Sequence, residues 1–318
     1  MVTTAPTVHD EAGEVTVFVA GGSGTIGRPL VRALVAAGHH VVAMTRSSAR
    51  QAQIAQLGAT PVAADALDAV AVERVVRATS PTHLVHQLTA LPVAGPRSEA
   101  DLEATNRLRE EGTRNLLRAA EAVGIRRIVV GSFAPFAARI PTARRCEGIE
   151  RAVRAVQSME EQVLVASWRG AIESIVLRYG LFYGTGTPST DQMIALARKR
   201  RLPTLMNDRG RLPFIHLADA VTATVAALHS GVSTGVYHIV DDQPDSMSEM
   251  VREMAALTGA PQPFAIPRWL LQLTQPYLAR MLSLDLSLPN ADARRDLEWS
   301  PRFPSYREGL RNDLLVRN

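Results

Sequence analysis

The amino-acid sequence predicts an α/β protein in which helices cover both faces of a parallel sheet. Short apolar runs rich in β-branched residues alternate with amphipathic stretches of about 10 to 20 residues, the usual pattern of strands and crossover helices. A glycine-rich turn follows the first apolar run and precedes the first amphipathic stretch. Because parallel connections cross over with the right hand, we expect a doubly wound sheet with strand order 3-2-1-4-5-6.

The individual elements follow from apolar periodicity and from the residues that end helices. Gly58 and Gly124 directly follow two amphipathic stretches, where glycine is a common C-terminal stop. A late apolar run is expected to return to the sheet as an additional strand. The expected strands are 15–20, 40–44, 60–64, 84–88, 127–131, 172–178 and 236–240. The expected helices are 29–37, 47–57, 69–78, 100–123 and 150–168.

Composition is that of an ordinary globular protein, with 46% hydrophobic residues and a mean hydropathy of +0.01. The net charge is +4 and the basic residues are spread along the chain, so we expect no nucleic-acid partner. No apolar run is long enough to span a membrane, and residues 1–14 lack a secretion signal, so a cytoplasmic location is expected. A single cysteine and scattered histidines do not have the spacing of metal ligands.

The glycine-rich turn has the spacing of a dinucleotide phosphate loop. Gly21 allows a tight turn after the strand, Gly24 lets the backbone approach the pyrophosphate, and Gly27 lets the helix pack closely on the sheet. Thr25 and Ile26 lead into the helix, whose free N–H groups would face the phosphates. The loop leaves an apolar strand and opens a helix, which is the context that this motif requires.

The residues after the second and third strands indicate which dinucleotide is bound. Sites that prefer NAD(H) usually carry an acidic residue at the end of the second strand, but no aspartate or glutamate occurs between residues 15 and 64. Arg46 stands there instead, and its guanidinium could hold a 2′-phosphate. Asp65, after the third strand, could accept a hydrogen bond from the adenine amino group or cap a helix. We therefore expect NADP(H) rather than NAD(H).

The alternation of strands and helices weakens after Tyr183, where proline becomes frequent and apolar runs shorten. This change predicts a second, smaller and mostly helical substrate domain, and a flexible arm at the N-terminus. The expected NADP-binding domain comprises 15–183 and 212–240; the substrate domain comprises 184–211 and 241–318; the arm comprises 1–14.

Several segments together resemble the extended short-chain dehydrogenase/reductases, the epimerase and dehydratase group. The resemblance covers nearly the whole chain and implies a Rossmann fold, a nicotinamide dinucleotide and a small-molecule substrate. It also places Asn106 and Ser132 near the cofactor; the alternative for Asn106 is a polar position on a buried helix. Leu88 and Thr89 end the fourth strand, where ligands bind in open sheets, and Thr89 could face the ribose or nicotinamide or simply pack at the strand end. The matching segments are 21–27, Thr105-Asn106 to Gly112-Thr113, Val130-Gly131-Ser132, 177–184, 213–220 and 297–301; a narrower, epimerase-like subgroup shares Val85-His86-Gln87-Leu88-Thr89 and Asn106-Arg107-Leu108-Arg109.

The chain departs from the family at the usual proton relay, a tyrosine with a lysine four residues later. No tyrosine has a lysine at that spacing, and Lys199 is the only lysine. The expected helix 150–168 contains neither residue type. Ser132 is present after the fifth strand, but Phe133 aligns with the catalytic hydroxyl. The sequence therefore predicts cofactor binding with a non-standard relay.

Three residues are the candidate catalytic groups. Tyr179 follows the sixth strand and His216 precedes a later helix, both at the ligand-binding edge of the sheet, and Ser132 lies beside them. The alternative for Tyr179 is core packing. His216 could point at the substrate and is the second candidate for an acid or base. The charge run 198–201 is either a solvated face or a receptor for an anionic substrate.

Three classes of function follow from this sequence. The first is an NADP(H)-dependent oxidoreductase or epimerase-like enzyme with a substitute relay. The second is a redox-neutral enzyme, such as a dehydratase, cyclase or isomerase, on the same fold. The third is a non-catalytic nucleotide-sensing protein. Fold alone does not choose among them, because function depends on the site. A homodimer is left open.

Overall fold

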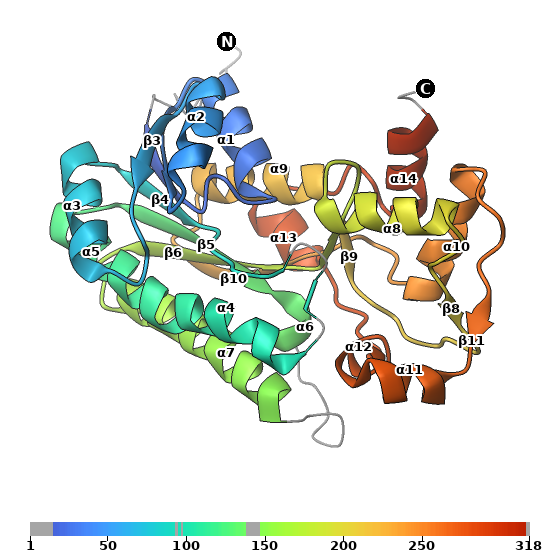
Figure 1. Ribbon diagram of the computed structural model, residues 1–318. Coiled ribbons are helices and arrows are strands. Elements are labelled where there is room, and N and C mark those ends of the chain that lie inside the picture. Colours follow the sequence, from blue (N-terminus) through green and yellow to red (C-terminus); the bar gives the residue numbers. More distant parts are fainter. Residues whose placement is uncertain (1–14, 93–94, 97, 138–146, 316–318) are drawn as a thin grey trace, which may run out of the picture.

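The computed structural model describes residues 15–92, 95–96, 98–137 and 147–315, and its centre is a seven-stranded sheet in which every strand pair is parallel (Figure 1). The strand order β3-β2-β1-β4-β5-β6-β10 confirms the expected doubly wound order, with the late strand next to the sixth. The strands are β1 (Thr16–Ala20), β2 (His40–Thr45), β3 (Thr60–Ala63), β4 (His83–His86), β5 (Arg127–Phe133), β6 (Glu173–Tyr179) and β10 (Thr234–Ile239).

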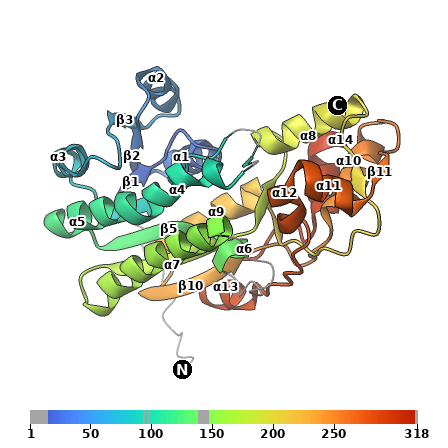
Figure 2. The same cartoon turned by 60° about the horizontal axis from the view of Figure 1, so that its bottom comes forward.

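Helices cover both faces of this sheet, as the apolar central strands require. One core contains side chains from α1, α2, α9 and α13 packed on one face of the sheet. The other core contains side chains from α3, α5 and α7 on the opposite face (Figures 1 and 2). The helices are α1 (Gly27–Ala36), α2 (Ser48–Gln56), α9 (Leu217–His229) and α13 (Ala291–Asp296), then α3 (Ala69–Thr79), α5 (Thr113–Val123) and α7 (Glu147–Trp168).

The single helix expected over 100–123 is divided in the structure. It begins as a 3₁₀ turn, η1 (Glu99–Leu102), continues as α4 (Glu103–Arg107) and passes through a π-helical turn, η2 (Leu108–Gly112), before α5. A π turn inserts one extra residue into a helix, a change that periodicity does not reveal and that is frequent at functional sites. Here the turn buries Leu108, Arg109 and Gly112.

The C-terminal region is mostly helical, as expected, and packs on a third apolar core. Outside the central sheet the structure also contains two small parallel sheets, β7–β9 and β8–β11, that the sequence did not predict, because strands of two or three residues leave no measurable alternation. The domain boundaries themselves stay predictions. The remaining elements are α6 (Ala134–Ala137), β7 (Leu181–Tyr183), α8 (Pro188–Arg198), β8 (Thr204–Leu205), β9 (Phe214–His216), α10 (Met247–Leu257), β11 (Ala265–Ile266), α11 (Arg268–Thr274), α12 (Pro276–Met281) and α14 (Tyr306–Leu315).

Across the described part of the chain, no helix combines the length and the apolar character needed to cross a membrane.

Asp241 follows β10 at the junction between the sheet and the C-terminal region. It is 4% exposed and lies close enough to the buried hydroxyl of Tyr183 to interact with it, although neither group makes a hydrogen bond of ordinary geometry among the described residues. Burial raises the pKa of Asp241 to about 8, because desolvation disfavours the charged form. The folded protein therefore holds this carboxyl group in its protonated form at neutral pH.

Asp241 should make the stability of the protein depend on pH. In the unfolded chain an aspartate titrates near 3.8, so the folded state binds this proton more tightly. The contribution to the free energy of unfolding is complete below about pH 4 and is lost as the pH rises through about 8. Asp241→Asn, which stays neutral, should flatten this decline. Urea unfolding at about pH 5, 6.5 and 8 measures it, and parallel pH profiles for both proteins would contradict the assignment.

Candidate dinucleotide and substrate site

The loop between β1 and α1 leaves no room for side chains at two of its glycines. Gly21 has a φ of +94°, and a Cβ there would lie 2.8 Å from the carbonyl oxygen of Gln87. A Cβ on Gly27 would overlap the carbonyl oxygen of Gly21. Gly24 differs, because its Cβ would meet only that same oxygen, at 3.2 Å. The structure thus gives Gly21 and Gly27 packing roles and leaves Gly24 facing space that a ligand can approach.

The N-terminus of α1 offers the hydrogen-bond donors that a pyrophosphate needs. Ile26 precedes the helix and makes no side-chain capping bond, and the first turn contains no acidic residue. Thr25 beside it is half-buried. An uncapped helix N-terminus carries free N–H groups and a partial positive charge, both of which favour a bound phosphate.

The structure brings together the two residues predicted to contact the adenosine half. Arg46 follows β2, Asp65 follows β3, and their side chains approach to 3.9 Å between Nη1 and Oδ2. They are 60% and 45% exposed, so the contact is a weak surface pair worth about 0–1 kcal/mol. Asp65 also accepts a hydrogen bond from the backbone N–H of Leu67, at 3.0 Å. A ligand phosphate can therefore take over the Arg46 guanidinium at little cost.

The end of β4 contributes one structural histidine and two residues that reach the surface. His86 is 1% exposed and hydrogen-bonds Thr113 through Nε2, at 3.0 Å, while its Nδ1 accepts the N–H of Leu88. Burial lowers the pKa of His86 to about 4, so the ring is neutral. Leu88 is half-buried and Thr89 is exposed, beyond the strand end at which ligands bind in such sheets.

Tyr179 lies inside the core. Its ring is 3% exposed, and its hydroxyl lies 2.9 Å from Nε2 of Gln87, which donates to it, and 2.7 Å from Oγ1 of Thr224. Burial raises the pKa of Tyr179 to about 12. Its predicted role in a relay stays a prediction, and these contacts favour a structural role that ties β4, β6 and α9 together.

His216 is also fully engaged by the protein. Its Nδ1 accepts the N–H of Ala218 at the start of α9, which fixes the proton on Nε2. Nε2 then donates to the carboxylate of Asp313 in α14, at 3.2 Å. The hydrogen bond to His216 helps to hold the pKa of Asp313 at about 2. The imidazole is 6% exposed and joins the C-terminal helix to β9; its predicted acid–base role stays a prediction.

Ser132 belongs to a buried cluster on the opposite face of the sheet. Its hydroxyl donates to Oε1 of Glu160 in α7, at 2.6 Å, and Arg178 of β6 pairs with the same carboxylate, also at 2.6 Å. One and two turns before Glu160, the same side of α7 presents Val156 and Ala152, both fully buried. The helix that covers the end of β5 therefore presents a short apolar surface and contains neither tyrosine nor lysine.

Asn106 has a partner that the sequence analysis did not single out. Its Oδ1 accepts a hydrogen bond from Nη1 of Arg109 at 3.3 Å, and both residues are buried. Arg109 lies 5.9 Å from the ring centroid of Phe136, just beyond β5. In the sequence Arg109 served only as part of a subgroup motif, since nothing local indicates that a helical arginine in an amphipathic stretch points inward.

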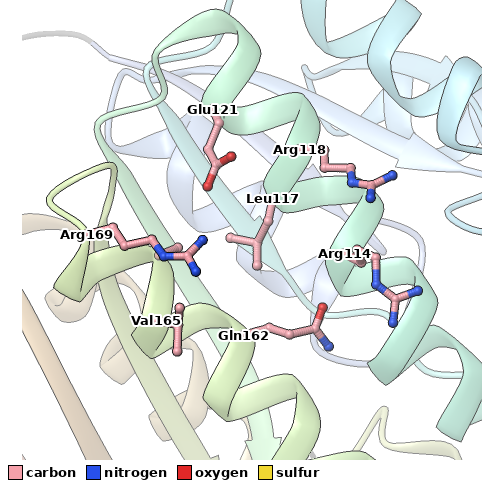
Figure 3. Close-up of a pocket in the computed structure, with 8 residues that line it drawn as sticks. Arg114, Leu117, Arg118, Glu121, Gln162, Val165 and Arg169 are labelled. Carbon is pink, nitrogen blue, oxygen red and sulfur yellow. The ribbon is translucent and has the colours of Figure 1, made fainter.

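Two other groups of arginines lie away from this edge. A surface hollow of about 260 Å³ between α5 and α7 is lined by Arg114, Arg118 and Arg169, together with Glu121 and Gln162 (Figure 3). The charge run 198–201 at the end of α8 is exposed. Among the described residues, no group of three or more histidine, cysteine, aspartate or glutamate side chains could hold a metal ion.

Comparison with known proteins identifies the family. The model of the NAD dependent epimerase/dehydratase family matches residues 17–240, and the chain belongs to this family. A 3-diazoavenalumate denitrifying reductase from Streptomyces sp is 38% identical over 308 residues, covering 92% of this chain and 98% of that protein. A 2-alkyl-3-oxoalkanoate reductase from Stenotrophomonas maltophilia is 26% identical over 334 residues, covering 93% and 97%.

Solved structures of the family share the fold. The Thermotoga maritima UDP-glucose 4-epimerase with UDP-glucose aligns with a TM-score of 0.77 at 17% identity, covering 95% of this chain and 98% of that one. The Thermus thermophilus UDP-glucose 4-epimerase in complex with NAD aligns with a TM-score of 0.74 at 22% identity, covering 94% and 97%. Membership of the NAD dependent epimerase/dehydratase family supports binding of a nicotinamide dinucleotide.

Substitution of Gly24 should separate binding from folding. Gly24→Val should abolish dinucleotide binding, because the side chain would occupy the position of the pyrophosphate, while the fold remains largely intact. Calorimetric titration with NADPH and circular dichroism measure the two effects. Gly231→Ala is a matched control, since a Cβ there meets nothing within 4 Å. Dinucleotide binding by Gly24→Val would mean that the loop is only a turn.

Proposed function

We propose that this protein is an NADP(H)-dependent reductase of a small molecule that works without a tyrosine–lysine relay. The proposal depends on a contrast between the glycine-rich loop, which suits a dinucleotide, and helix α7, which lacks the residues of the usual proton relay. The loop from Gly21 to Gly27 has the geometry of a dinucleotide-binding turn. By contrast, α7 bonds Ser132 through Glu160, buries Val156 and Ala152 one and two turns earlier on the same side, and contains neither tyrosine nor lysine. Similarity to named reductases favours an oxidoreductase over a redox-neutral enzyme or a nucleotide-sensing protein.

The missing relay suggests which group accepts the hydride. Reduction of a carbonyl leaves an alkoxide that needs a nearby proton donor, and the hydroxyl of Tyr179 and the imidazole of His216 already have buried protein partners. When bound, a reduced nicotinamide would supply the hydride for this reduction. At a diazonium carbon the new C–H bond would form as the C–N bond breaks and its electron pair leaves with N₂. This reduction needs no proton. The 3-diazoavenalumate denitrifying reductase carries such a conversion in its name.

In this proposal the protein binds, orients and excludes water rather than transferring protons. The loop and the α1 N-terminus hold the pyrophosphate, and the strand ends of β4 and β5 receive the nicotinamide half. The apolar face of α7 keeps water from the reacting carbon, which protects a reactive diazo compound from side reactions. We therefore propose an aryl diazo compound as the substrate class.

Preference for NADP(H) should depend on Arg46. If its guanidinium holds the 2′-phosphate, NADP(H) should bind more tightly than NAD(H), and Arg46→Ala should remove most of the difference. A charge-assisted contact of about 1.5–3 kcal/mol corresponds to a loss of roughly 10- to 150-fold in NADPH affinity. Arg77→Ala is the control, because Arg77 is exposed on α3 and pairs only with Glu73. Equal affinities for the two dinucleotides in the native protein, measured by calorimetry, would refute this assignment.

The reaction is tested by following NADPH absorbance with a diazo and a carbonyl substrate. We expect oxidation of NADPH with 3-diazonio-4-hydroxybenzoate, release of N₂ and formation of 4-hydroxybenzoate, above the rate without enzyme. Tyr179→Phe should lower turnover by less than about 10-fold, against about 10²–10⁴-fold for a general acid. A different result would establish the substitute relay: fast reduction of aldehydes or ketones by the wild-type protein, with that activity lost in Tyr179→Phe or His216→Ala. Turnover without any change in nicotinamide absorbance would establish redox-neutral chemistry.

A further inference from the structure

Arg109 is a buried cation with one modest hydrogen bond. The side chain lies on the π-helical turn η2 and is 6% exposed. A guanidinium has five N–H donors, and within the described part of the chain only Nη1 has a hydrogen-bond partner, Oδ1 of Asn106 at 3.3 Å. No ion pair to Arg109 exists among the described residues. A charge removed from water without a counter-ion is costly, so its retention at this position needs an explanation.

Among the described residues, no carboxylate is available to neutralise Arg109. The acidic side chain that acts on it electrostatically is Glu160, whose oxygens are already bonded to Ser132 and Arg178. Desolvation lowers the pKa of Arg109 to about 10, so the group remains cationic at neutral pH. The counter-ion of Arg109 must therefore come from outside the described part of the protein. A ligand carboxylate suits this role, because its two oxygens can accept two parallel hydrogen bonds from one guanidinium.

The surroundings of Arg109 place this charge beside the reacting end of the site. Its guanidinium lies 5.9 Å from the ring centroid of Phe136, and that ring packs edge-on against Phe133 with centroids 5.0 Å apart. Phe133 directly follows Ser132 at the end of β5. Tyr277 of α12, in the C-terminal region, also acts on Arg109 electrostatically. In Figures 1 and 2, α6 and α12 face each other where the sheet meets that region.

We propose that Arg109 is the specificity-determining residue of this protein and binds the carboxylate of an aromatic acid whose ring packs against Phe133 and Phe136. The inference rests on the proposed reductase function and adds its substrate class. The names of the two relatives, avenalumate and oxoalkanoate, both describe carboxylates. The π turn explains the placement, because the extra residue in the helix directs a cationic side chain inward.

The test is binding of matched probes to the protein loaded with NADP⁺. Wild-type protein should bind 4-hydroxybenzoate about 10- to 150-fold more tightly than 4-hydroxybenzamide in calorimetry, as expected for a charge-assisted pair. Arg109→Met should bind both equally, and Arg109→Lys should recover part of the preference, since it keeps the charge but not the fork. Arg107→Met, an exposed arginine two residues earlier, is the matched control and should keep the full preference.

Thermal unfolding separates a ligand-binding role from a structural one. Removal of an unpaired buried charge should leave the Tm of Arg109→Met unchanged or higher, whereas loss of a structural arginine would lower it. Equal binding or no detectable binding of the two probes by wild-type protein overturns the assignment. A lowered Tm of Arg109→Met together with an unchanged preference for the carboxylate also overturns it. Absence of diazo reduction with the preference retained would refute the proposed function and leave the Arg109 site standing.

Discussion

Close backbone packing in the loop between β1 and α1 is the constraint on which the rest of the structure depends. The loop passes so near the carbonyl oxygen of Gln87 that Gly21 has no room for a Cβ, and Gly27 presses against the carbonyl of Gly21. This contact fixes the start of α1 against the ends of β1 and β4. The helix can present its N–H groups to a phosphate only because no side chain holds it away from the sheet.

A second set of contacts ties the strand ends to the helices on both faces. On one face Gln87 bonds Tyr179, which bonds Thr224 of α9. Gly131 permits this arrangement, because a Cβ there would overlap the Gln87 side chain. On the other face Glu160 of α7 holds Ser132 and Arg178. Buried hydrogen bonds therefore hold this edge of the sheet to the helices on both of its faces.

Two buried ionisable side chains, Asp241 and Arg109, differ in how they can relieve the cost of burying a charge. Asp241 has no counter-ion among the described residues, and burial raises its pKa to about 8, so it relieves the cost of burial by holding a proton. Arg109 has no such option, because its guanidinium stays charged even with a pKa lowered to about 10. A carboxyl group can become neutral on its own, whereas an arginine needs an anion. The unpaired cation is therefore the feature that points to a ligand.

The sequence by itself determined the fold class, the strand order and the tight glycine-rich turn after β1, because apolar periodicity and glycine spacing are local signals. It also determined the absence of a tyrosine–lysine spacing, which is a property of residue order alone. Only the tertiary structure decided that Tyr179 and His216 are held by buried partners. It alone revealed the π turn that buries Arg109 near Phe136. Such side-chain environments arise from elements distant in the chain, and local patterns carry no record of which polar groups will meet.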